Sequence, residues 1–147
     1  MALTDFLSKD DQTRITDAIA MAEKRTSGEI CVHITPKCGG DVMEAAEKKF
    51  NKLGLYKTER RNAVIIYVAY KSEKFAILGD EGINNVVPDD YWRVEKDTLG
   101  KYLSQGKPAD GICEVVAQIG ESLATYFPPV ENDVNELSNE VSYSDEE

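Results

Sequence analysis

Eight consecutive residues in the middle of the chain read Ala63-Val64-Ile65-Ile66-Tyr67-Val68-Ala69-Tyr70, and all eight are apolar or aromatic. A strand with one face in solvent alternates polar and apolar residues, whereas a strand that is covered on both faces reads as a continuous apolar run. We therefore expect residues 63–70 to form the central strand of a sheet that carries helices on both faces.

The segments on either side of this run predict its neighbours. Residues 71–74 form a short polar turn, and residues 75–78 are expected to return as an antiparallel strand in a hairpin. Upstream, residues 29–35 alternate so that Ile30, Val32 and Ile34 share one face, which is typical of another strand. A fourth strand would complete a small sheet, although no segment marks its position.

Helical periodicity accounts for much of the remaining chain. The first helix begins with a capping-box pattern at Ser8 and Asp11, and apolar spacing predicts helices over residues 8–25, 43–53, 91–107 and 112–126. Gly100 and Gly106 are expected to interrupt the third of these. The order of elements predicts an α/β fold, a three-layer α/β/α sandwich with a small mixed central sheet of about four strands.

Charge divides the chain into two parts. The formal net charge is -10, but residues 130–147 hold seven acidic and no basic residues, so residues 1–129 are only mildly acidic. The terminal part has little apolar surface to offset the entropy cost of ordering. We expect one domain over residues 1–129 and an acidic, disordered tail over residues 130–147.

Composition also narrows the class of partner. Nucleic acid and anionic membrane both require a basic surface, so neither is expected as a partner. The chain shows no signal peptide and no transmembrane run. Its three cysteines, Cys31, Cys38 and Cys113, fit no metal-ligand spacing. A monomeric cytoplasmic protein with reduced, packed thiols is the expectation.

An acidic loop follows the expected hairpin. Residues 79–92 contain two glycines, two asparagines and four carboxylates, Asp80, Glu81, Asp89 and Asp90. Calcium takes six to eight oxygen ligands from carboxylates, amide and backbone carbonyls and water, and magnesium also prefers oxygen. The loop therefore suits Ca²⁺, with Mg²⁺ as the alternative. The competing interpretation is a solvated loop, in which Asp89 and Asp90 simply favour the start of the next helix.

A second loop is needed if calcium binds, because about seven oxygens are required and the spacing differs from an EF-hand. Glu59, just before the central strand, is the first candidate, and Asp110 and Asp41 follow. Asp41 also fits an ordinary exposed acid. Beside Glu59, the pair Arg60-Arg61 suits either charge neutralisation and phosphate binding or a solvated charge cluster.

Catalytic residues cannot be assigned from the sequence. His33 is the sole histidine and is expected to be neutral and hydrogen-bonded within its strand. The chain contains no serine nucleophile elbow and no cysteine–histidine motif. Whether the protein is an enzyme therefore stays open at this point.

The chain resembles the TPM domain family, which is named partly for a thylakoid lumen protein, over residues 7–128. The resemblance is carried, in order, by residues 22–30, by Thr58-Glu59-Arg60-Arg61-Asn62 and the strand after it, by residues 77–83, by Trp92, and by Tyr126-Phe127-Pro128. It implies an α/β/α sandwich whose loops cross at one end of the sheet and bind divalent metal, calcium in particular. It also implies phosphatase activity, which is reported for some members.

Three functions compete on this basis. The first is a calcium-binding module whose crossing loops are ordered by metal, so that the bound form presents a new surface to a protein partner. The second is a metal-dependent acid phosphatase. In the third, the acidic tail recruits a basic partner and the metal is only structural.

Overall fold

The computed structural model describes residues 1–129 and 141–144 and contains one mixed sheet of four strands in the order β3-β2-β1-β4. The central strand β2 (Ala63–Ala69) is buried along its whole length. It pairs in parallel with β1 (Glu29–Thr35) and antiparallel with β3 (Lys74–Gly79). The predictions of a covered central strand and of a mixed sheet are both confirmed.

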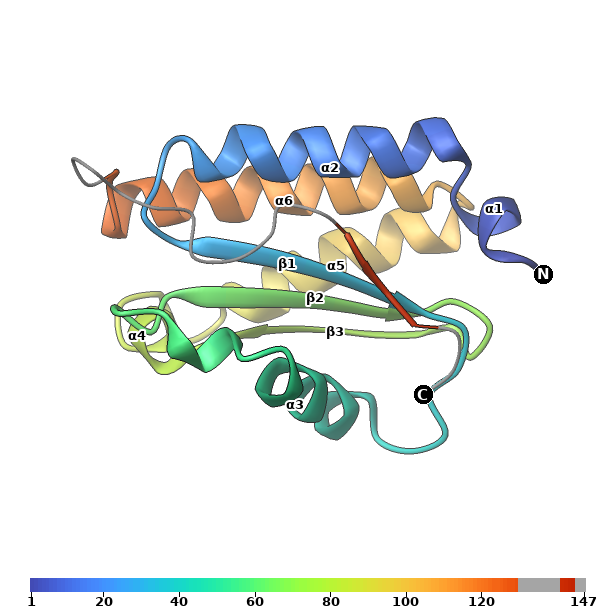
Figure 1. The fold of residues 1–147 in the computed structure, drawn as a ribbon, viewed down its shortest axis with the longest axis horizontal. Helices are drawn as coiled ribbons and strands as arrows, with labels where there is room; N and C mark the ends of the chain where they lie inside the picture. Colours follow the sequence, from blue (N-terminus) through green and yellow to red (C-terminus); the bar gives the residue numbers. More distant parts are fainter. Residues whose placement is uncertain (130–140, 145–147) are drawn as a thin grey trace.

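Helices cover both faces of the sheet (Figure 1). One face carries α2 (Lys9–Glu23), α5 (Tyr91–Ser104) and α6 (Pro108–Tyr126), and the other carries α3 (Val42–Lys52). Three short elements were not predicted: α1 (Leu3–Phe6), the 3₁₀ helix η1 (Leu55–Lys57) and α4 (Glu81–Asn84). The three-layer α/β/α sandwich is confirmed.

The alternation of side chains along the strands places core residues on both faces of the sheet. Ile30, Val32 and Ile34 of β1 join the larger core under α2, α5 and α6. Tyr67 and Ala69 of β2 face the opposite way and pack with Ala46 of α3.

The interruption expected at Gly100 is wrong, because α5 continues through it. A Cβ atom at position 100 would lie 3.3 Å from Cζ of Phe75 on β3, so this glycine permits close packing of helix on strand. Gly106, by contrast, has a φ of +71° and follows the end of α5. Only the second glycine acts as a helix terminator.

Part of the expected disordered tail forms the fourth strand. β4 (Ser142–Tyr143) pairs in parallel with β1, and the backbone N–H of Ser144 donates to the carbonyl of Ile34 at 3.1 Å. Val141 is buried in the larger core. The acidic composition of residues 130–147 as a whole gave no sign of this short strand, which pairs with His33 and Ile34 of β1. The rest of the tail, residues 130–140 and 145–147, lies outside the described residues.

His33 is the residue that β4 covers. It is 1% exposed, and its Nδ1 and Nε2 atoms hydrogen-bond to the hydroxyls of Ser142 and Ser144, each at 2.8 Å. Its ring stacks on Tyr67 with a centroid distance of 5.5 Å. The prediction of a hydrogen-bonded strand histidine is confirmed.

We expect the double variant Ser142→Ala, Ser144→Ala to lower the free energy of unfolding by about 2 kcal/mol, because two hydrogen bonds to a buried ring are lost at about 1 kcal/mol each. Urea unfolding would measure the change. Ser104→Ala is a suitable control, since this exposed hydroxyl bonds only within its own helix. A loss equal to that of the control would show that β4 does not hold His33 in solution.

The three cysteines are free thiols, and burial raises the pKa of Cys31 to about 12. A thiol with so high a pKa is a poor nucleophile.

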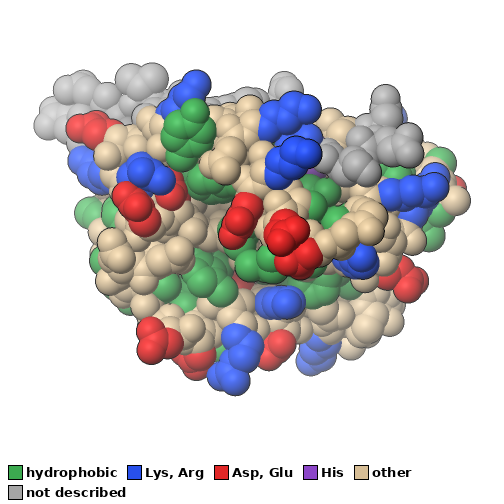
Figure 2. Space-filling model, turned by 90° about the horizontal axis from the view of Figure 1, so that it is seen from below, with side chains coloured by type: hydrophobic (Ala, Val, Ile, Leu, Met, Phe, Trp, Pro, Cys, Tyr) green, Lys and Arg blue, Asp and Glu red, His purple; other side chains and the backbone are tan. Residues whose placement is uncertain are grey.

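Within the described parts of the chain, none of the helices has the length and hydropathy needed to cross a bilayer. On the face that carries α3, acidic and basic side chains are interspersed (Figure 2).

Candidate functional site

Two loops cross at the end of the sheet where β2 begins and β3 ends. The backbone N–H of Asp80 donates to the carbonyl of Ala63, and that of Gly82 donates to the carbonyl of Arg61, both at 2.9 Å. A Cβ atom at Gly82 would lie 2.2 Å from the carbonyl oxygen of Arg60 and 2.6 Å from that of Arg61. The crossing that the family resemblance implies is therefore present, and it depends on a residue without a side chain.

Arg61 adopts an unusual backbone conformation at this crossing. Its φ of +51° lies in the left-handed region, which costs free energy for a residue that is not glycine. The turn is closed by a hydrogen bond from the N–H of Arg61 to the carbonyl of Thr58. Next to it, Asn62 is buried and its amide nitrogen lies 3.4 Å from the hydroxyl of Ser27. The turn directs Arg61 toward the second loop.

Asp80 and Arg61 form a bidentate ion pair at the centre of the site. Nε of Arg61 donates to Oδ2 of Asp80 at 2.7 Å, and Nη2 donates to Oδ1 at 3.0 Å. The Asp80 side chain is only 7% exposed, whereas that of Arg61 is 42% exposed. The hydrogen bond to Asp80 raises the pKa of the Arg61 guanidinium further, so it stays charged at any physiological pH.

Asp80 also caps the short helix α4. Its Oδ1 accepts a hydrogen bond from the N–H of Glu81 at 2.8 Å. Described residues thus use three of the roughly four lone-pair positions of this carboxylate, and one stays available on Oδ2. Glu81 shares the same guanidinium, with its Oε1 3.3 Å from Nη1 of Arg61. Two carboxylates therefore share one positive charge.

Trp92 and Asn84 brace the acidic loop. The indole N–H of Trp92 donates to Oδ1 of Asn84 at 2.8 Å, and Nδ2 of Asn84 donates to the carbonyl of Gly79 at 3.0 Å. A Cβ atom at Gly79 would lie 2.2 Å from Cζ2 of Trp92, so the ring packs directly on the glycine backbone. These contacts use the indole N–H of Trp92, the Asn84 carbonyl oxygen and one of the two N–H groups of the Asn84 amide.

A pocket of about 300 Å³ opens beside the ion pair. Its polar lining includes Asn51, Tyr56, Arg61, Asp80 and Asn84. Hydrogen-bond donors and acceptors, both charged and neutral, therefore line a concave space at the loop crossing. Ligand sites usually lie in concave spaces of this kind.

The remaining predicted ligands of this loop pair are more dispersed. Glu59 is exposed in the same turn as Arg61. Asp89 and Asp90 are exposed just before α5, and Asp90 lies 3.6 Å from Arg93. Asp90 is the N-cap residue of α5 but makes no side-chain cap hydrogen bond within the described structure. Across residues 1–129 and 141–144, no three His, Cys, Asp or Glu side chains converge as a preformed metal site.

Asp110 and Asp41 do not belong to the site. Asp110 lies in the first turn of α6, at the opposite end of the sheet, where its Oδ1 accepts from Nη2 of Arg14 at 2.7 Å. Asp41 caps α3 by accepting from the N–H of Met43. Asp41 is exposed, as expected.

Arg61, Tyr56 and Asn84 line one pocket, which the sequence alone did not reveal. Arg61 was ambiguous because tandem arginines are common on surfaces. Its ion pair with buried Asp80 and its left-handed backbone separate it from exposed Arg60. The glycines on either side of Asp80 and Glu81 were the available signal. Each glycine marks a backbone position that another segment approaches closely.

Comparison with known proteins agrees with this architecture. Residues 1–122 match the family model of the TPM domain. The NMR structure of BA42 protein from the psychrophilic bacterium Bizionia argentinensis is 38% identical, with a TM-score of 0.89, and the match covers 97% of this chain and 99% of that one. The N-terminal domain of cg2496 protein from Corynebacterium glutamicum is 20% identical, with a TM-score of 0.64 and coverage of 79% and 73%, and it shares the fold. No curated protein sequence matches. The family model covers most of the chain, which therefore belongs to the TPM domain family.

Proposed function

We propose that the two crossing loops bind a divalent cation, Ca²⁺ in preference to Mg²⁺, and that Asp80 and Glu81 supply the carboxylates. The observation that carries this proposal is the buried Asp80 carboxylate, whose charge is balanced by a guanidinium that it shares with Glu81. Two carboxylates and one arginine leave a net negative charge, whereas a divalent ion would neutralise both carboxylates.

Arg61 occupies the position that the ion would take. Metal binding therefore requires the guanidinium to leave Asp80, and its exposure allows this movement at little steric cost. Further oxygen ligands would come from three exposed acids in or next to the crossing loops, Glu59, Asp89 and Asp90. Calcium tolerates irregular geometry and completes its shell with water, which suits a site that forms on binding.

The consequence for function is a metal-responsive module. Release of Arg61 changes both the charge and the shape of the surface around the 300 Å³ pocket, and a protein partner that reads this surface would distinguish the metal-bound form. The free thiols of the chain suit a reducing compartment such as the cytoplasm.

Calorimetric titration of the full chain with CaCl₂ tests the proposal. We expect binding in the micromolar to millimolar range and an affinity at least tenfold lower for Asp80→Asn, because one ligand charge is lost. Asp10→Asn, an exposed acid on α2, is the matched control and should bind like the parent. Equal affinities for the two variants would exclude Asp80 as a ligand.

Arg61→Gln separates this proposal from a purely structural ion pair. If the guanidinium competes with the ion, its removal should raise calcium affinity about three- to tenfold, since a positive charge leaves the site. A variant that binds calcium more weakly than the parent would contradict the proposed competition.

A metal-dependent phosphatase is the second candidate. It is favoured by the pocket itself, where a released Arg61 would meet Asn51, Tyr56 and Asn84, all of which can donate hydrogen bonds to a phosphate. The matching family model also carries the word phosphatase in its name. Turnover of p-nitrophenyl phosphate that needs calcium or magnesium and is lost in both Asp80→Asn and Arg61→Gln would support this candidate. Turnover that survives both changes would exclude the pocket as its site.

A further inference from the structure

A second and larger cavity lies at the opposite end of the sheet from Asp80. It is an open cleft of about 530 Å³ between the N-terminal segment, the end of β2, the start of β3 and the end of α5. This volume is in the range of small-molecule sites. The cleft shares no lining residue with the pocket at the loop crossing.

Aromatic rings form much of its wall. Phe6 of α1 stacks on Tyr70 with a centroid distance of 5.0 Å and an interplanar angle of 15°, and Phe75 of β3 lies beside them in the lining. Gly100 keeps the floor open next to the Phe75 ring. Aromatic faces of this kind attract both flat apolar groups and cations.

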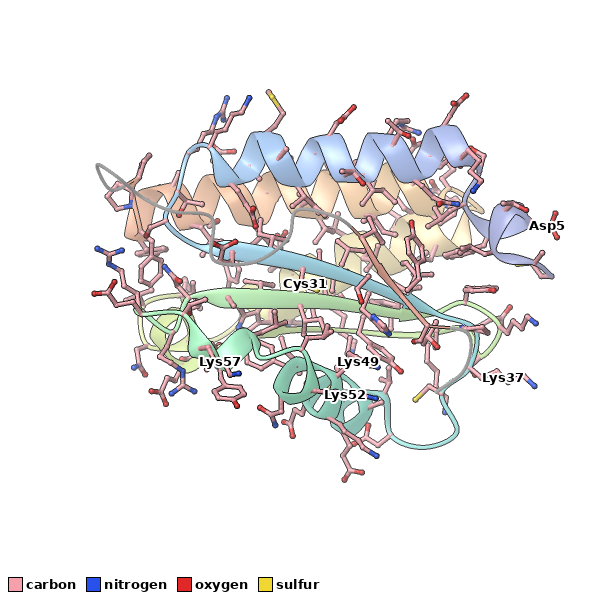
Figure 3. The ribbon with its side chains drawn as sticks, in the orientation of Figure 1. Asp5, Cys31, Lys37, Lys49, Lys52 and Lys57 are labelled. Atoms are coloured by element: carbon pink, nitrogen blue, oxygen red, sulfur yellow. The ribbon has the colours of Figure 1, made fainter. Side chains whose placement is uncertain are left out.

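Two acidic side chains belong to the lining of the cleft. Asp5 and Glu73 both line it, and Figure 3 shows Asp5 on α1 at this end of the molecule. Met1 also lines the cleft and is 69% exposed, and Asp5 and Glu73 are exposed as well.

Lys74 also lines the cleft, but its ammonium is held by backbone carbonyls of the segment before α3. Successive side chains of a strand point to opposite faces, so Lys74 and Phe75 diverge. The Lys74 ammonium lies 3.0 Å from the carbonyl of Gly40 and 3.5 Å from that of Cys38, on the α3 side of the sheet. The cleft therefore combines aromatic side chains with two exposed carboxylates, while the Lys74 ammonium is held on the α3 side of the sheet. The Asp5 carboxylate accepts a hydrogen bond from the N–H of Ala2 at 2.9 Å.

We propose that this cleft binds a small organic cation, an amine that carries an aromatic or similarly flat apolar group. The ring of such a ligand packs on Phe6, Tyr70 and Phe75, while its ammonium faces Asp5 and Glu73. This site is independent of metal binding at Asp80.

Three matched probes test the assignment on the full chain: phenethylamine, 2-phenylethanol and phenylacetate, which differ in charge but share one ring. Backbone amide shifts would be followed by ¹H–¹⁵N NMR. We expect phenethylamine to shift Phe6, Tyr70, Phe75 and Gly100 and to bind about three- to tenfold more tightly than 2-phenylethanol. Phenylacetate should bind most weakly. An alcohol or acid that binds as tightly as the amine would overturn the proposal, as would the absence of shifts with all three probes.

Variants locate the source of the preference. Asp5→Asn combined with Glu73→Gln should reduce phenethylamine affinity to that of the alcohol and leave alcohol binding unchanged, whereas Glu44→Gln, an exposed acid on α3, should alter neither. Ser104→Trp places a bulky ring at the exposed mouth and should weaken all three probes. Unchanged amine binding in either cleft variant would contradict the assignment. Asp80→Asn should bind the amine like the parent even if calcium binding fails.

Discussion

Replacement of Gly82 by alanine is expected to lower the free energy of unfolding by about 3 kcal/mol. The added methyl group would lie 2.2 Å and 2.6 Å from the carbonyl oxygens of Arg60 and Arg61. Both contacts are to backbone, which cannot turn away as a flexible side chain could. Alanine favours a helix over glycine by about 1 kcal/mol, and the clash must exceed this gain.

Urea unfolding measures this effect, and Gly39→Ala is the matched control because nothing lies within 4 Å of a Cβ atom there. The NMR signals of Arg61 and Asp80 should also move in the Gly82 variant, since separation of the loops disturbs their ion pair. If both alanine variants have the same stability, the loops do not cross in solution as described here.

Glu95→Gln is expected to raise stability by about 2 kcal/mol at pH 8 and to leave it unchanged near pH 4.5. Glu95 lies on α5, is 5% exposed, and its Oε1 makes no hydrogen bond within the described residues. Burial, together with the nearby Glu114 carboxylate, raises its pKa from 4.5 to about 7.

The sign of the pH dependence follows from proton binding. Between pH 4.5 and 7 the folded protein keeps the proton on Glu95, whereas the unfolded chain has released it. The stability that the protonated carboxyl contributes is therefore complete below pH 4.5 and is lost as pH rises through 7. Glutamine stays neutral throughout and avoids this loss.

Thermal unfolding from pH 4.5 to 8 would show the difference, and Asp97→Asn, an exposed acid on the same helix, is the control. A constant difference between Glu95→Gln and the parent across this range would contradict the raised pKa. A ¹³C titration of the Glu95 carboxyl would then give the value directly.

Most of the fold could be predicted because the spacing of apolar residues along the chain indicates which side chains of a strand or helix are buried. The apolar run at residues 63–70 gave the central strand, and the spacing in residues 8–25 gave α2 with its cap at Ser8. Gly100 misled because local propensity opposes a glycine within a helix, whereas its contact with Phe75 on another element favours one. The strand at residues 142–143 was missed for a similar reason: its partners, His33 and Ile34, are more than 100 residues away.

The candidate site could be predicted only in outline. Asp80 and Glu81 were identified from the acidic loop, but a sequence does not show which acid is buried. Asp80 is buried, whereas Asp89 and Asp90 are exposed. Asp110 had the same chemistry as Asp80, yet the topology places it at the other end of the sheet beside Arg14. Distances between loops depend on the tertiary fold and cannot be read from spacing.

The most direct test of calcium binding at the crossing loops is the ¹⁵Nε signal of Arg61 during a calcium titration of the full chain. Nε donates to Oδ2 of Asp80 at 2.7 Å in the present structure, so its proton should be protected and its shift distinctive. Saturating calcium is predicted to abolish that protection and to move the Asp80 and Glu81 amides with the same apparent affinity. A signal that stays unchanged in 10 mM calcium, while Asp80 remains paired with Arg61, would contradict the proposed function.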